Sequence, residues 1–199
     1  MSDTGPELQT VWNEAKEHIE HGEYDKAIEI YKYVIIRYGD NDIAVEYANA
    51  YLGDIYLKLR KFNSAKNHIK KAIECRPDNP GYHYLLGFTY SMQSQWGKAI
   101  SEFEVAVSKQ PSNGEYLRGL GWAIHCAGNK VKGLAYLHKA LHLTPTSVNI
   151  LTDLAVAYLS DLQLGKAHEY AETAVRIDPN SNLAREVLAN IDRFQRNLG

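Results

Sequence analysis

Two histidines on one expected helix offer the most direct case for chemistry in this sequence. His138 and His142 lie four residues apart, the spacing at which two imidazoles on one helical face can bind a metal ion. A metal site of this kind needs a third ligand, and none follows with a fitting spacing. We therefore expect no metal site, and we expect both rings to lie on the solvated outer side of their helix.

The other reactive residue types give no catalytic pattern either. Cys75 and Cys126 lack CxxC spacing, so they predict neither a zinc site nor a disulfide framework. The adjacent Ser160 and Asp161 are typical of a turn that ends a helix. The sequence contains no glycine-rich phosphate loop, nucleophile elbow or HExxH motif. We predict a protein that is not an enzyme, with no catalytic residues and no cofactor.

Composition favours a folded chain whose partners are proteins. Of the 199 residues, 45% are hydrophobic and 23% are charged, which is typical of globular rather than disordered chains. The formal net charge is −2, whereas nucleic-acid-binding domains more often carry a net basic surface, so we expect no nucleic-acid partner. No apolar stretch is long enough to span a membrane, and residues 1–7 lack the apolar core of a signal peptide. A cytoplasmic location is the expectation.

A period of 34 residues organises the chain. It separates four of the six prolines, namely Pro77, Pro111, Pro145 and Pro179. It also separates five leucines, each followed by a small residue: Leu52, Leu86, Leu120, Leu154 and Leu188. Repeats of this length predict stacked supersecondary units.

Each period contains two expected helices. His83, Leu86, Gly87 and Tyr90 follow the i, i+3, i+4, i+7 spacing of one helical stripe, and a second stripe begins after residues 95–97. Side chains that can cap a helix N-terminus precede each expected first helix. The candidates are Asn79, Ser112 or Asn113, Thr146 or Ser147, and Ser181.

These positions resemble the tetratricopeptide repeat. The third repeat matches best, through Leu86, Gly87, Tyr90, Ala99, Phe103 and Pro111. The resemblance covers roughly residues 8–197 and implies an all-α, right-handed superhelical solenoid of antiparallel helix pairs. We expect a flexible N-terminus over 1–7, five repeats at 8–41, 46–79, 80–113, 114–147 and 148–181, and a capping helix over 182–199. The register slips by four residues between the first two repeats, and we place the extra residues around Tyr38 to Asp42.

The resemblance also implies that the first helices line a concave side. A quarter-turn from the packing stripe, this face would carry aromatic and charged side chains of the types that dominate binding hot spots. The candidate partner-binding residues are Trp12, Lys16, Asp54, Tyr84, Phe88, Met92, Arg118, Trp122 and His125. Alternatively, Phe88 and Trp122 pack between neighbouring first helices.

Some family members hold the C-terminal carboxylate of heat-shock chaperones with a clamp of Lys, Asn and Arg side chains. The matching positions here hold Trp12, Lys16, Tyr51, Gly81 and Leu85, so the clamp is absent. The favoured function is a protein–protein interaction scaffold that binds a peptide or helix in the concave groove. The alternative is an assembly factor or co-chaperone for a larger complex. Self-association also stays open, because an incompletely capped terminal repeat would expose apolar surface.

A basic cluster lies in the second repeat. It consists of Lys58, Arg60, Lys61, Lys66, Lys70 and Lys71. On a helix such a run is either a solvated face or a surface that attracts an acidic partner.

Overall fold

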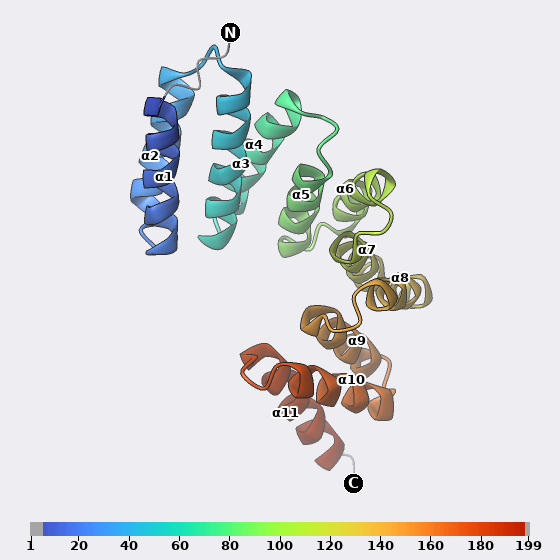
Figure 1. Ribbon diagram of the computed structural model, residues 1–199. Coiled ribbons are helices and arrows are strands. Elements are labelled where there is room, and N and C mark those ends of the chain that lie inside the picture. Colours follow the sequence, from blue (N-terminus) through green and yellow to red (C-terminus); the bar gives the residue numbers. More distant parts are fainter. Residues whose placement is uncertain (1–5, 198–199) are drawn as a thin grey trace. The chain divides into compact units, whose positions relative to one another are not determined.

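The computed structural model describes residues 6–197, and every regular element within them is an α-helix. This confirms the all-α prediction (Figure 1). The helices are α1 Pro6–Glu20, α2 Tyr24–Arg37, α3 Asp42–Lys58, α4 Phe62–Cys75, α5 Pro80–Met92, α6 Trp96–Lys109, α7 Gly114–Cys126, α8 Lys130–Leu143, α9 Val148–Ser160, α10 Leu164–Ile177 and α11 Asn182–Arg196. Residues 6 and 7, which we assigned to a flexible terminus, are helical, and residues 1–5 lie outside the described part. None of the described helices is long and apolar enough to cross a bilayer.

The chain forms two compact units, each of which stacks helices in sequence order. The N-terminal unit comprises residues 1–95 and the C-terminal unit residues 96–199. In the N-terminal unit, α1 packs on α2, α2 on α3, α3 on α4, and α4 on α5. In the C-terminal unit the same neighbour-to-neighbour packing runs from α6 to α11, and α11 also reaches α9. Stability in such an array depends on contacts between adjacent helices.

The turn inside each helix pair has the same backbone geometry. After α9, the Leu162 N–H donates to the carbonyl of Leu159 at 2.9 Å, and the Gln163 N–H donates to the carbonyl of Tyr158 at 3.0 Å. This is the Schellman pattern, which satisfies the last carbonyls of a helix and places one residue in the left-handed region. The left-handed residues are Gly22, Arg60, Ser94, Gly128 and Leu162, with φ values between 55° and 99°.

The turn between repeats explains the periodic prolines. Residues 76–79 form a β-turn in which the Asn79 N–H donates to the carbonyl of Arg76 at 3.2 Å, and Pro77 takes the second position, where a fixed φ is favoured. The Asn79 side chain then caps α5 by accepting from the Gly81 N–H at 2.9 Å. The predicted caps on α7, α9 and α11 are confirmed as well, at Asn113, Ser147 and Ser181.

The register slip lies further along the chain than we predicted. The turn before α3 has the usual four residues, 38–41, and ends in the capping residue Asn41. Instead, α3 has 17 residues where α5, α7 and α9 have 13. Four residues are close to one helical turn of 3.6, so the insertion lengthens the helix without rotating its packing stripe away from the core.

Helices α7 and α8 approach each other almost backbone to backbone. A Cβ added at Gly121 would lie 2.9 Å from the Gly133 carbonyl oxygen, and one added at Gly133 would lie 2.6 Å from the backbone nitrogen of His125. Contacts this short cannot be relieved by moving a side chain. Gly133 takes the place that alanine holds at Ala99 and Ala167, and this close approach is the reason.

Replacing Leu162 by glycine should raise the free energy of unfolding by about 0.5–1 kcal/mol, because glycine removes the Cβ strain of the left-handed conformation. The side chain is 68% exposed, so little packing is lost. Urea denaturation measures the change. The matched substitution Gly128→Ala should lower stability by about 1 kcal/mol, since no atom lies within 4 Å of the added methyl and φ alone changes the energy. Equal stability of Leu162→Gly and wild type would contradict the strain argument.

Removing residues 182–199 should expose apolar surface. In α11, Ala184, Val187 and Ile191 are buried against the helices α9 and α10. Without this cover we expect a lower melting temperature and concentration-dependent aggregation, followed by thermal melting and light scattering. A truncated chain that stays monomeric and melts like the full chain would show that α11 does not cap the array.

Candidate partner-binding surfaces

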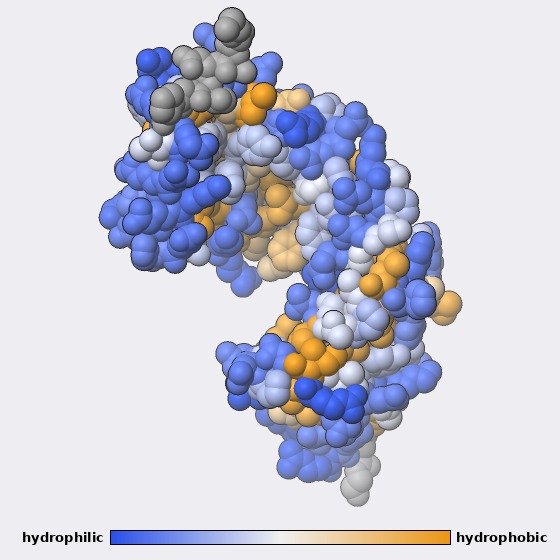
Figure 2. Space-filling model, in the orientation of Figure 1, coloured by the Kyte–Doolittle hydropathy of each residue, from blue (hydrophilic) through white to orange (hydrophobic). Residues whose placement is uncertain are grey.

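An apolar stripe lies along one side of α5 in the N-terminal unit. Tyr84, Phe88 and Met92 are spaced i, i+4, i+8, so they share a helical face. Phe88 is 38% exposed and Met92 40% exposed, while Tyr84 is half-buried. Leu86 and Tyr90, on the other side of α5, are buried in the core. Figure 2 shows apolar surface in the region of α5, and the exposed fractions of Phe88 and Met92 leave this face open to a partner.

An aromatic cluster joins α1, α2 and α3. The ring of Trp12 lies 5.5 Å from Tyr31 and 6.2 Å from Tyr51, and the two tyrosines stack at 5.0 Å. Tyr31 is fully buried, which raises the pKa of its hydroxyl, and that hydroxyl has no hydrogen-bond partner among the described residues. Trp12 is half-buried, so it packs the helices together and offers only part of its ring to a partner.

The charged candidates of the N-terminal unit are near the surface. Lys16 is exposed on α1. Asp54 accepts from Lys58 at 2.9 Å, one turn further along α3, and its side chain is 40% exposed. An exposed pair of this kind can exchange its partner at little cost, because such pairs contribute about 0–1 kcal/mol.

The guanidinium of Arg118, in the C-terminal unit, donates its hydrogen bonds to residues of the same unit. Its Nε donates to Glu115 at 2.8 Å, and a terminal nitrogen donates to Asp153 at 2.8 Å. Burial raises the pKa of the Asp153 carboxyl, and the Arg118 charge opposes that shift. The side chains of Arg118 and Asp153 are only 17% and 21% exposed, so the pair ties α7 to α9.

His125 is also committed to the fold, since it is 7% exposed. Its Nε2 lies 3.0 Å from Ser160 Oγ, and that hydroxyl donates to the carbonyl of Ala157 at 2.7 Å. The hydroxyl therefore accepts from the histidine, so Nε2 carries the proton. Trp122 stacks on the imidazole at 6.0 Å and is half-buried. Burial lowers the pKa of His125.

Some important polar contacts were missed by the sequence analysis. Arg118 with Asp153 and His125 with Ser160 are each separated by 35 residues, one more than the period, and this offset is the signal that could have revealed them. Glu46 is buried in the N-terminal unit, where it accepts from the Tyr82 hydroxyl at 2.6 Å and from Arg76 at 2.9 Å. The contacts of Arg118 with Asp153, of His125 with Ser160 and of Tyr82 with Glu46 join successive repeats.

The prediction that both histidines of α8 are solvated is wrong for His138. Its Nε2 lies 2.7 Å from the Tyr158 hydroxyl, and its ring contacts Tyr158 and Tyr170 with centroids 5.9 Å away in both cases. Burial lowers the pKa of this ring. The side of α8 that bears His138 packs on the next helix pair, whereas His142 is exposed. The described residues contain no group of three or more His, Cys, Asp or Glu side chains that could hold a metal ion.

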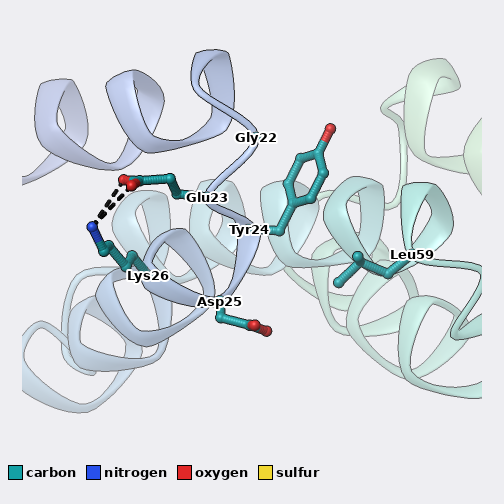
Figure 3. A pocket seen from close by; sticks show the side chains of 6 residues that line it. All are labelled: Gly22, Glu23, Tyr24, Asp25, Lys26 and Leu59. Carbon is teal, nitrogen blue, oxygen red and sulfur yellow. Dashed lines mark hydrogen bonds and ion pairs between the residues drawn. The ribbon is translucent and has the colours of Figure 1, made fainter.

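A small hollow of about 340 Å³ lies between two turns of the N-terminal unit. It is lined by residues 22–26 and by Leu59 (Figure 3). Glu23 and Lys26 pair with each other at 3.0 Å, and Lys26 and His18 lower the pKa of the Glu23 carboxyl. Because Glu23 and Lys26 already pair with each other, the hollow presents chiefly Tyr24, Leu59 and the carboxylate of Asp25. It offers no converging polar groups for a small ligand.

Comparison with known proteins agrees with this architecture. Two models of the tetratricopeptide repeat match residues 47–79 and 68–101. The chain is a tetratricopeptide-repeat protein, as the resemblance of its third repeat predicted. The repeat surfaces described above are therefore those of a helical-repeat protein, a class that uses extended repeat surfaces for binding.

Its curated relatives are much longer. The human protein O-mannosyl-transferase TMTC1 is 29% identical over 61% of this chain and 14% of its own length. The bovine BBSome complex member BBS4 is 24% identical over 79% of this chain and 30% of its own length. The chain thus spans less than a third of either relative.

Solved structures show the same fold along most of the chain. A tetratricopeptide-repeat protein of Thermus thermophilus, TTC0263, superposes with a TM-score of 0.75 at 21% identity, covering 92% of this chain and 97% of its own. YrrB, described as a repeat protein with an unusual peptide-binding site, gives a TM-score of 0.64 at 21% identity, covering 87% of this chain and 88% of its own.

Buried His125 should make stability depend on pH. Because burial lowers its pKa below the usual value of about 6.5, its contribution to stability is present above that pH and is lost as the pH falls through the folded-state value. His125→Gln should flatten the fall in the urea midpoint between about pH 7.5 and pH 5. The exposed His142→Gln is the control and should keep the wild-type slope. Identical slopes in all three proteins would contradict this origin.

Proposed function

We propose that the chain is a non-enzymatic scaffold that binds a peptide or helix of a protein partner through the exposed face of its first helices. The observation that carries the proposal is the stripe of Tyr84, Phe88 and Met92 on α5. Large apolar side chains on a folded surface are favourable to bury, at about 25 cal/mol per Å². Aromatic side chains and methionine are enriched at interfaces of this kind.

The shape of the stripe favours an extended or helical guest with apolar anchors. Side chains four residues apart on a helix lie one turn apart, so a partner helix with its own i, i+4 apolar pair would fit between them. Elsewhere on the same unit, the exposed Lys16 and the exchangeable Asp54–Lys58 pair supply charge, which chiefly sets the specificity and rate of association. Trp12 adds part of an aromatic ring.

The candidate residues of the C-terminal unit differ in how much of each side chain a partner can contact. Trp122 is half-buried and can give a partner one edge of its ring. Arg118 can touch a guest only while keeping its bond to Asp153. His125 is too buried to touch a partner, so we leave it out of the contact surface.

The comparisons support a binding role and leave its detail to experiment. The name of YrrB includes a peptide-binding site, and that of BBS4 places it in a multi-subunit complex. The second name favours the alternative that this chain helps to build or belongs to a larger assembly. The transferase activity named for TMTC1 is not carried over, because the match covers 14% of that protein. We also propose that the partner is a protein rather than a nucleic acid, and that the chain is cytoplasmic. Both proposals rest on the sequence alone.

The double substitution Phe88→Ala with Met92→Ala should weaken partner capture by tenfold or more, because truncating two anchors of a hot spot costs about 1–2 kcal/mol each. Capture is measured by quantitative mass spectrometry after affinity purification from native lysate, with helicity and melting checked by circular dichroism. The matched control is Ile36→Ala with Val131→Ala, two side chains that are each 83% exposed on second helices. If the α5 variant and the control retain the same partners at the same yield, the proposed surface is wrong.

A further inference from the structure

Charge is segregated along the N-terminal unit. Residues 58–71 carry six cationic side chains and no carboxylate. The described residues before them, 6–57, carry eleven carboxylates against four lysines and arginines. Residues 58–71 are therefore strongly basic within a chain of formal net charge −2, and Glu74 adds one exposed carboxylate in the last turn of α4.

The lysines of α4 face solvent. Ala65, Ile69 and Ala72 bury one side of the helix, and Lys70 and Lys71 are exposed on the other. Lys66 is half-buried and makes only a long contact of 3.5 Å with Asn63 Oδ1. Over residues 6–197, neither Lys70 nor Lys71 forms an ion pair. This surface therefore presents positive charge that the fold does not neutralise.

Helix α1 has the opposite character. Leu8 and Ala15 are buried on its inner side. Its outward side carries four exposed glutamates, Glu7, Glu14, Glu17 and Glu20, and one exposed lysine, Lys16. Glu14 lies 4.0 Å from His18, while Glu17 and Glu20 form no ion pair with any described residue.

The two helices do not neutralise each other within one molecule. In the N-terminal unit α1 packs on α2, whereas α4 packs on α3 and α5. We propose that the acidic face of α1 docks on the basic face of α4 in a second copy of the chain. The two surfaces differ, so the contact is head-to-tail and lets copies add one after another.

The composition of the α4 surface favours an acidic helix over other anionic occupants. The exposed residues of α4 are Asn63, Asn67, Lys70, Lys71, Glu74 and Cys75. None is an aromatic side chain on which a nucleic-acid base could stack, and none is a large apolar side chain that could insert into a bilayer. The complementary negative charge is present on the same chain, as the exposed glutamates along one side of helix α1. Exposed ion pairs are individually weak and are screened over about 10 Å at 0.1 M salt, so the association is weak and depends on ionic strength.

Neutralising substitutions on each face test the contact. Sedimentation velocity is run over a range of protein concentrations in about 20 mM and about 500 mM salt, where screening is weak and strong. A reductant is included because Cys75 is exposed. The variants are Lys70→Gln with Lys71→Gln on α4, and Glu17→Gln with Glu20→Gln on α1. The matched control is Lys132→Gln with Lys139→Gln, two exposed lysines of the second helix α8.

Wild type and the α8 control should associate at low salt, with a mean mass that rises with concentration, and should be monomeric at high salt. Each of the α1 and α4 variants should be monomeric in both buffers. An equimolar mixture of these two variants should form a dimer that grows no further, because only one acidic and one basic face remain intact. Monomeric wild type at low salt, association that survives either double substitution, or a mixture that stays monomeric would overturn the proposal. The proposal would also be overturned if wild type did not self-associate but its α4 face bound a poly-glutamate peptide or an RNA.

Discussion

The close contact between the two helices of a pair is the constraint on which the rest of the structure depends. Between α7 and α8, a methyl group on Gly121 or Gly133 would meet backbone atoms at 2.9 Å or less. Between α3 and α4 the corresponding Gly53 faces the Ile69 side chain, where a Cβ would lie 2.5 Å from Cγ1. Glycine inside a helix costs about 1 kcal/mol relative to alanine. The approach that it permits buries the apolar stripes of both helices and recovers that cost.

Two kinds of turn convert this paired contact into a repeat. The left-handed residue inside each pair reverses the chain within three residues. The four-residue turn between pairs, which contains proline in every case except residues 38–41, starts the next helix with a side-chain cap. Both turns keep a fixed length, and every second helix from α2 to α10 has 14 residues. The one insertion is absorbed as a full helical turn in α3, which keeps the inner stripe in register.

Because the core and the turns use the buried side chains, binding depends on the side chains that remain exposed. On α5 these are apolar, at Phe88 and Met92, and on α1 and α4 they are charged. In the C-terminal unit, polar side chains of the first helices join successive repeats, as Arg118 of α7 does with Asp153 of α9. The surfaces proposed for binding therefore lie mainly on the N-terminal unit, one apolar and two of opposite charge.

The sequence alone determined the period, the pairing of helices, the presence of a side-chain cap before α5, α7, α9 and α11, and the family, because these follow from local spacing and turn chemistry. The structure selected Asn113 over Ser112 and Ser147 over Thr146 as the capping residues. It also selected the helix face on which Phe88 and Met92 lie. Only the tertiary structure decided that these two stay exposed while His125, on the same face, is buried, and that His138 packs on tyrosines. A helical period specifies the direction of a side chain. Its exposure depends on what the neighbouring helix places opposite, and that neighbour lies 20 residues away in sequence for His138 and 35 for His125.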